Sequence, residues 1–247
     1  MASSNKILAL DDWGLSPGVN EGILELAKLG LVRTVSILPN SKHADYLLEE
    51  LKRTGAGLSF HLNFTLGKPL VEGASSLTNS RGEFRGFSGF MCHFFTGKIN
   101  RNDLAREAIA QATFLAETLG VPPALLEAHH NLHLVPGVFS QIREPLWAMG
   151  YRFVRTIANR DHWFAYAASK RLLLGDWQAA PVYYPPHRAF ENAVELEKYL
   201  SARPSHLPFV AHPALVDDLA KTGIEDSLTS RRRQFDLIVA QLARSGS

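Results

Sequence analysis

Short apolar runs alternate with amphipathic stretches along most of the chain, and this alternation predicts βα units around a parallel sheet. The expected strands are the apolar runs at about 6–10, 34–38, 57–61, 124–128, 151–155 and 209–211. Between them, apolar residues recur at helical spacing, which predicts helices near 17–29, 44–51, 103–119, 138–149, 191–201 and 229–243. The pattern is typical of a (β/α) barrel or a doubly wound α/β domain.

Residues that start and stop helices support these limits. Ser16 is expected to cap the first helix, with Pro17 at its first position and Gly30 at its end. The helix that ends near residue 119 is expected to be capped by Asn102 and closed by Gly120.

A long connection at about 64–100 interrupts the alternation. It is rich in Gly and Ser, and connections of this length are usually functional or disordered. Several phenylalanines favour an ordered segment; they are Phe84, Phe87, Phe90, Phe94 and Phe95. We therefore expect a lid-like excursion with one or two short helices, within a single domain that spans residues 1–247.

Composition narrows the class of protein. A chain of 247 residues with 46% hydrophobic content can bury the core of one domain. The formal charge of +2 offers no extended basic field for nucleic acid. A single cysteine, Cys92, excludes an internal disulfide framework, and no apolar run approaches the roughly 20 residues of a membrane span. Because the first residues also lack the pattern of a secretory signal, we expect a cytoplasmic protein.

Polar side chains gather where the predicted strands end. They are Asp11, Asp12, His61, His129, Arg155 and His212. The carboxyl ends of parallel strands converge at one mouth of a barrel, so we expect these groups to lie together. One carboxylate with two imidazoles is a common set of metal ligands that leaves positions open for water and substrate. The sequence therefore predicts a metal-dependent hydrolase.

Other polar groups have a structural interpretation. The Asp11-Asp12 pair alone could serve only to cap the next helix or bind turn amides. His43 and Asp45 stand two apart in an expected helix and so face away from each other, which argues against a ligand pair. The run Arg231-Arg232-Arg233 is interpreted as a solvated helix face. Cys92 lacks the His and Asn neighbours of a thiol nucleophile.

Four segments resemble the YdjC-like carbohydrate deacetylases, a family that includes chitooligosaccharide deacetylases. In chain order they are residues 11–20, 61–70, 129–136 and 212–214. The resemblance implies an α/β fold of the distorted (β/α) barrel type and removal of acetyl groups from N-acetylated amino sugars. It also implies one divalent metal ion, magnesium or zinc, and a small-molecule or oligosaccharide substrate. A homodimer is compatible with the long exposed connection.

The resemblance also implies roles for individual residues. The metal ligands would be Asp12, His61 and His129, and the general base would be Asp11. The general acid would be His212, and Arg155 would orient or tune a catalytic carboxylate. Two further residues of the matching segments, Asn63 and His133, would bind the substrate.

The chain departs from the family pattern in two places. Trp13 stands where phenylalanine is usual, and residues 127–133 read Glu-Ala-His-His-Asn-Leu-His where the family has Asp-Ser-His-x-His-x-His. The second departure leaves open a catalytically altered homologue that binds metal or sugar. The phenylalanine-rich segment leaves open a deacylase of lipid-linked or antibiotic amino sugars. A phosphoester hydrolase is disfavoured, because the chain has no glycine-rich phosphate cradle.

Overall fold

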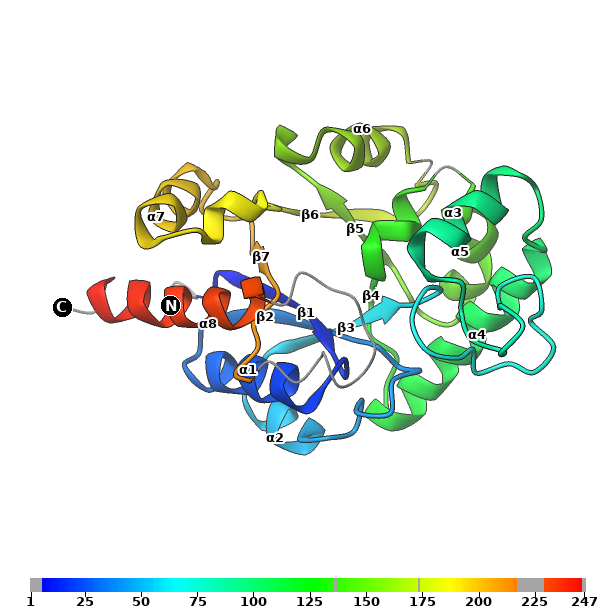
Figure 1. Cartoon of the computed structure of the whole chain (residues 1–247), viewed down its shortest axis with the longest axis horizontal. Coiled ribbons are helices and arrows are strands. Elements are labelled where there is room, and N and C mark those ends of the chain that lie inside the picture. Colours follow the sequence, from blue (N-terminus) through cyan, green and yellow to red (C-terminus); the bar gives the residue numbers. More distant parts are fainter. Residues whose placement is uncertain (1–5, 136, 173, 217–228, 246–247) are drawn as a thin grey trace.

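A computed structural model of the protein describes residues 6–135, 137–172, 174–216 and 229–245. A curled sheet lies at the centre, and all of its strand pairs are parallel (Figure 1). The spatial order is β6-β5-β4-β3-β2-β1-β7. The strands are β1 (Leu8–Trp13), β2 (Val32–Ile37), β3 (Gly57–Leu62), β4 (Leu125–Ala128), β5 (Phe153–Ile157), β6 (Gln178–Val182) and β7 (Phe209–Ala211). A single bridge from Tyr183, just after β6, to Phe209 of β7 links the two edges of the sheet. The predicted distorted (β/α) barrel is thus confirmed.

Helices surround this sheet, and most of them follow the predicted βα pattern, whereas α6 was not predicted. The α-helices are α1 (Pro17–Lys28), α2 (Leu48–Arg53), α3 (Gly86–Phe95), α4 (Arg101–Leu119), α5 (Val138–Ala148), α6 (Trp163–Arg171), α7 (Ala193–Ala202) and α8 (Thr229–Ser245). Three short 3₁₀ helices follow strands or precede helices: η1 (His129–Leu134), η2 (Arg160–His162) and η3 (His187–Phe190). None of the helices within the described ranges combines the length and the apolar character needed to cross a bilayer.

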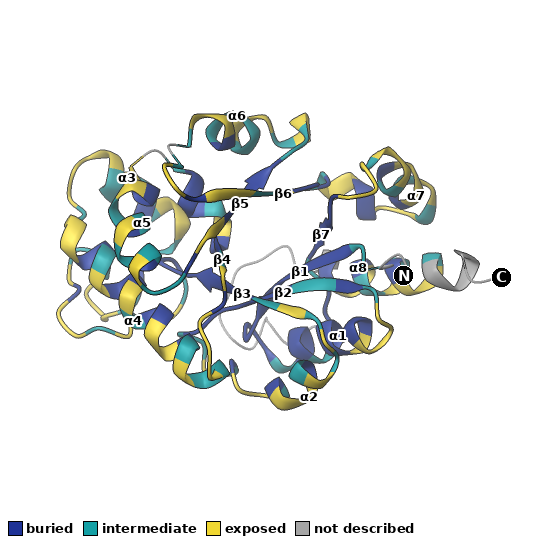
Figure 2. Cartoon of the chain, turned by 180° about the vertical axis from the view of Figure 1, so that it is seen from behind, coloured by how far each residue is buried: buried dark blue, intermediate teal, exposed yellow. Residues whose placement is uncertain are grey.

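The core lies between the sheet and the helices. Figure 2 shows buried residues along the inner strands, while the outward faces of the helices are exposed. Strand β1 is buried over its whole length, as expected for a strand covered on both faces. The carboxyl-terminal halves of β2, which pairs with β1, and of β3, which pairs with β2, are buried too, and they carry polar residues of the site.

Several local predictions differ from the structure. Strand β6 was not predicted, because four of its five residues are not buried and it contains Pro181, so it shows no apolar run. The helix expected from residue 44 begins only at Leu48, after Leu47 takes a left-handed conformation with φ 62°. Helix α4 is capped by Asn100, whose side chain accepts a hydrogen bond from the amide of Asn102. Ser16 caps α1 as predicted.

The connection at 64–100 is ordered and carries one α-helix, α3. Its first part is fixed on α4, because the amides of Leu70 and Val71 both donate to the Glu107 carboxylate at 3.0 Å. Its aromatic residues pack together: the rings of Phe64 and Phe90 stack with centroids 5.8 Å apart. The predicted order of this segment is confirmed, whereas its action as a lid stays a prediction.

Candidate metal centre and active-site cavity

The site begins at a kink in β1. The pairing of β1 with β2 is irregular between Leu10 and Trp13, and Asp12 takes a left-handed conformation with φ 73°. Such a conformation costs a residue other than glycine roughly 1–2 kcal/mol. In a regular strand, neighbouring side chains point to opposite faces, but here both Asp11 and Asp12 line one cavity. Trp13 fixes the chain after the kink, because its indole N–H donates to the Ala44 carbonyl at 2.8 Å.

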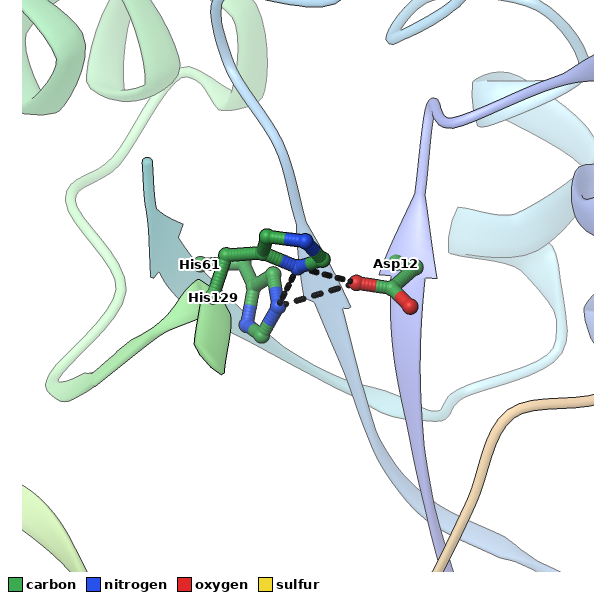
Figure 3. A group of neighbouring side chains, drawn as sticks. All are labelled: Asp12, His61 and His129. Atoms are coloured by element: carbon green, nitrogen blue, oxygen red, sulfur yellow. Dashed lines mark hydrogen bonds and ion pairs between the residues drawn. The ribbon is translucent and has the colours of Figure 1, made fainter. Parts of the chain in front are cut away.

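Three side chains from distant parts of the sequence converge on one point. Figure 3 shows Asp12 at the end of β1, His61 in β3 and His129 after β4 pointing toward one another. Asp12 Oδ1 lies 3.1 Å from His61 Nε2 and 2.8 Å from His129 Nδ1, and the two ring nitrogens are 3.4 Å apart. All three residues are buried. The predicted convergence at the strand ends is therefore present.

This triad has the chemistry and spacing of a metal site. The three ligand atoms are separated by only 2.8–3.4 Å, so one ion could be held by all of them. A second group that could hold an ion contains Asp11, His61 and Glu127. There, however, the Arg155 guanidinium already pairs with both carboxylates. The group with Asp12 is therefore the better candidate for a divalent cation.

The second oxygen of Asp12 is bound by an arginine that the sequence analysis placed elsewhere. Arg231 of α8 donates from Nη2 to Asp12 Oδ2 at 2.6 Å and is buried. The interpretation of the Arg231-Arg232-Arg233 run as a solvated face is therefore wrong for its first member and holds for the exposed Arg232 and Arg233. Burial alone would raise the pKa of Asp12, but Arg231 and His129 outweigh it and hold that pKa well below its usual value.

Asp11 belongs to a second buried network. Arg155 of β5 donates from both terminal nitrogens to the Asp11 carboxylate, at 2.6 and 2.8 Å, and Ser36 donates to Asp11 Oδ1 at 3.0 Å. The same guanidinium pairs with Glu127, which also accepts a hydrogen bond from Ser59 at 2.6 Å. Burial raises the pKa of Asp11, but the charges of Arg155, His61 and His212 together outweigh this effect and lower it.

The charges of these buried networks do not cancel. Asp11, Asp12 and Glu127 are three carboxylates, while Arg155 and Arg231 are two guanidinium groups, which leaves one negative charge. Buried charge is costly unless it is compensated. An excess of one carboxylate next to two imidazoles therefore favours the binding of a cation.

His212 lies beside the Asp11 carboxylate at the end of β7. Its Nε2 is 3.6 Å from Asp11 Oδ2 and 3.4 Å from the Tyr184 hydroxyl. Its backbone amide donates to Gln234 of α8 at 2.7 Å, which fixes the chain at this point. The imidazole is partly exposed, at 24%, so it is open to the cavity.

The two residues predicted to bind the substrate, His133 and Asn63, lie away from this cavity. His133 is fully buried; its Nδ1 accepts the amide proton of Ala128 and its Nε2 lies 3.0 Å from the Arg155 carbonyl. Asn63 is buried as well, and its carboxamide bonds to Asn40 and to the amide of Leu66. It lines a separate cavity of about 370 Å³. Their contact with substrate stays a prediction, and the structure gives both of them structural partners.

The cavity around the triad has a volume of about 240 Å³. Besides the predicted residues, its walls contain side chains that sequence reasoning missed: His130, Asn131, Tyr184, His187, Arg231 and Gln234. His130 and Asn131 are two consecutive residues in the left-handed region, with φ 56° and 53°. Strained pairs of this kind cluster at functional sites. The crowding of histidines at 129–133 was the one sequence signal for this wall.

Comparison with known proteins identifies relatives of this chain. Residues 7–243 match the sequence profile of the family described as YdjC-like protein. The carbohydrate deacetylase of Homo sapiens is 31% identical over 211 residues, which cover 83% of this chain and 59% of that protein. The carbohydrate deacetylase of Mus musculus is 33% identical over 157 residues, 62% of this chain and 51% of that one. The chain thus spans little more than half the length of these two relatives.

A bacterial relative matches over nearly its full length. The carbohydrate deacetylase of Geobacillus stearothermophilus is 29% identical over 241 residues, 89% of this chain and 94% of that protein. A crystal structure from Enterococcus faecalis V583, described as a candidate cellobiose-phosphate cleavage protein, has the same fold. Its TM-score is 0.75 at 21% identity, over 97% of this chain and 92% of that one. The match of the profile to nearly the whole chain shows that this protein belongs to the YdjC-like family.

Proposed function

We propose that the protein is a metal-dependent hydrolase that removes the acetyl group, or another acyl group, from the nitrogen of an N-acylated amino sugar. The observation that carries this proposal is the convergence of Asp12, His61 and His129 beside Asp11 and His212 in one cavity. Relatives named carbohydrate deacetylase support the sugar amide as the substrate.

Asp12, His61 and His129 would hold the divalent ion, either magnesium or zinc. When bound, such an ion supplies Lewis-acid chemistry, because it polarises a carbonyl oxygen and lowers the pKa of a water molecule. A mixed set of one oxygen and two nitrogen donors suits zinc and other divalent ions. Arg231 fixes the Asp12 carboxylate and leaves Oδ1 directed at the two imidazoles.

Asp11 would act as the general base. Its lowered pKa keeps it ionised near neutral pH, so it is able to accept a proton from the attacking water. Arg155 and Ser36 hold both of its oxygens in place. The same contacts weaken Asp11 as a base. Its contribution to catalysis would therefore depend on close contact with a water molecule whose pKa the ion would lower.

His212 would act as the general acid. It lies on the cavity wall, within 3.6 Å of the Asp11 carboxylate, whose negative charge attracts the protonated imidazole. Water adds its oxygen to the acyl carbon, the amide C–N bond breaks, and the nitrogen receives a proton from His212. The products are a free amino sugar and a carboxylate, which is acetate for an N-acetyl substrate.

The first test measures release of acetate from N-acetylglucosamine oligomers by purified protein supplied with magnesium or zinc. We expect hydrolysis by the wild type and a loss of at least about 100-fold for Asp11→Asn, since general-base catalysis contributes roughly 10²–10⁴-fold. His61→Ala should lose both activity and bound metal, because it removes one of three ligands.

His43→Ala is the matched control for His61→Ala. His43 lies outside the cavity and outside both groups that could hold an ion. This variant should keep the wild-type rate and metal content, measured by elemental analysis of the purified protein. Full activity of Asp11→Asn would contradict the role of Asp11, and acetate release by metal-free protein would contradict the metal-dependent reaction.

A further inference from the structure

A second, apolar groove opens next to the candidate active-site cavity. It has a volume of about 480 Å³ and lies between α3, α6 and the end of η1. Helix α3 contributes Phe87, Met91 and Phe95, and α6 contributes Phe164 and small alanines. In Figure 1, α6 lies at the top of the view and α3 at the right. Two side chains in the groove are largely exposed, Phe95 at 68% and Phe164 at 88%.

Apolar surface gathered in a groove usually marks a binding site. Contacts between side chains define the walls of this groove. Leu134 of η1 and the alanines Ala165 and Ala168 of α6 belong to one apolar cluster, and all three line the groove. The ring of Phe87 meets the ring of His130 edge-on, with centroids 5.0 Å apart. The groove is therefore attached to the histidine segment that carries the metal ligand His129.

The groove and the active-site cavity share one wall. His130 and Asn131 line both of them. The His130 ring lies 4.1 Å from the ring of His129, centroid to centroid. The left-handed conformation of both shared residues turns the chain sharply between the two spaces. A substrate whose reacting carbonyl lies at the triad thus has the apolar groove directly beyond this wall.

The polar and apolar walls differ in what they can bind. Tyr184, His187 and Gln234 come from the segments after β6 and from α8, and they offer hydrogen-bonding groups suited to sugar hydroxyls. The side with His130 and Asn131 leads instead to phenylalanine, methionine and alanine side chains. With the sugar bound against Tyr184, His187 and Gln234, the acyl chain of the amide points toward His130, Asn131 and the apolar groove.

We propose that the groove binds the acyl chain of the substrate and that the enzyme prefers N-acyl amino sugars whose chain is longer than acetyl. This inference rests on the proposed amide hydrolysis and names its substrate class. Each methylene that leaves water for an apolar groove strengthens binding by up to about fourfold. The acetyl group itself is too short to reach beyond the shared wall.

The test compares kcat/KM for N-acetyl-, N-butanoyl- and N-octanoylglucosamine below micelle-forming concentrations, by the appearance of free amine. Octyl N-acetylglucosaminide is included, because it carries the same alkyl chain on the anomeric oxygen. We expect the octanoyl amide to exceed the acetyl amide by at least about 30-fold, from six methylenes that are each partly buried. The octyl glycoside should show no comparable gain.

Phe87→Ser and Ala168→Trp test the groove itself. The first removes an apolar wall and should lower the octanoyl-to-acetyl ratio about tenfold; the second fills the groove and should lower it further. Phe114→Ser on α4 is the matched control, because Phe114 is exposed to 42% and Phe87 to 43%, and Phe114 lies outside the groove. This control should keep the wild-type ratio.

Three results would overturn the inference. The first is equal or better hydrolysis of the acetyl amide, and the second is a gain confined to the octyl glycoside. The third is a change of Phe87→Ser from dimer to monomer in sedimentation velocity, with an unchanged ratio, which would make the groove a contact between copies. If no amide is hydrolysed at all, titration calorimetry with the same sugars tests the groove alone. Tighter binding of the octanoyl sugar that is lost in Phe87→Ser would support binding of the acyl chain in the groove. Equal binding of the octanoyl and acetyl sugars would overturn it.

Discussion

His133 shows how one histidine of a cluster can serve the site without touching its cavity. Its Nδ1 accepts a backbone proton, and a carbonyl can only accept, so its Nε2 carries the hydrogen and the ring is neutral. Because Nε2 bonds to the carbonyl of Arg155, the ring supports the strand residue whose guanidinium holds Asp11. Burial lowers the pKa of His133 to about 4.

That pKa predicts a dependence of stability on pH. The unfolded chain binds a proton at His133 below about pH 6.5, while the folded protein does not bind it until about pH 4. Stability should therefore fall as the pH is lowered through this interval, by on the order of 3 kcal/mol. Urea unfolding of His133→Gln at pH 7 and pH 4.5 should show a smaller difference between the two conditions than the wild type. The difference that remains includes the contribution of His61, whose pKa is also lowered by burial.

Two features make this measurement specific. Asp11 and Asp12 have lowered pKa values, so they lose their charge only below about pH 4, outside the interval. His206→Gln is the control, since His206 is exposed. An equal dependence on pH in His133→Gln and the wild type would contradict the assignment.

At the scale of elements, α8 completes a site that otherwise comes from strand ends. Arg231 pairs with Asp12 of β1, and Gln234, one turn later, accepts the amide proton of His212 after β7. Residues three apart on a helix share a face, so one face of α8 contacts the carboxyl ends of both β1 and β7, which are parallel neighbours. The helix therefore closes the cavity on that side.

Removing the Arg231 charge should lower the free energy of unfolding most in the metal-free protein. Arg231→Met leaves the Asp12 carboxylate buried without this partner, and breaking a buried pair costs about 3–5 kcal/mol. A divalent ion at the triad would compensate the carboxylate, so magnesium or zinc should recover most of the loss. The free energy of unfolding in urea, with and without metal, checks this expectation.

Arg233→Met is the control for Arg231→Met, because Arg233 lies on the same helix and is exposed. Its free energy of unfolding should stay within about 0.5 kcal/mol of the wild type. A loss in Arg231→Met that metal does not reduce would mean that the arginine stabilises packing rather than the charge of Asp12.

The elements that could be predicted are those whose burial leaves a pattern. Strand β1 is buried throughout and appears as an apolar run, whereas β6 is mostly exposed and does not. The approach of Asp12, His61 and His129 was predictable, because parallel strands end at one mouth. Arg231 was not, since three consecutive arginines resemble a solvated face and only tertiary packing selects the buried one.

For the whole molecule, the candidate metal site brings together residues that are far apart in the sequence. Asp12, His61, His129 and Arg231 meet although the first and the last are 219 residues apart. A ligand that binds only the folded protein stabilises it by mass action. A divalent ion at the triad should therefore raise the stability of the entire fold.

The expected size of this effect is measurable. At a metal concentration of 100 times Kd, the stabilisation is about 2.7 kcal/mol, which for a chain of this length corresponds to roughly 5–10 °C in Tm. Thermal unfolding of chelator-treated protein, before and after addition of zinc or magnesium, measures it. His129→Gln should abolish the shift and His43→Gln should retain it. A shift that survives in His129→Gln would mean that the ion binds elsewhere.

The strand order has one more consequence, for the synthesis of the chain. The inner strand β1 is made first, but its partner on one side, β7, comes from residues 209–211. During synthesis on the ribosome, the backbone groups at that edge of β1 have no strand partner until residues 209–211 have emerged. The nascent protein is thus able to form most of its sheet early, yet the candidate site is complete only after β7 and α8 have been synthesised.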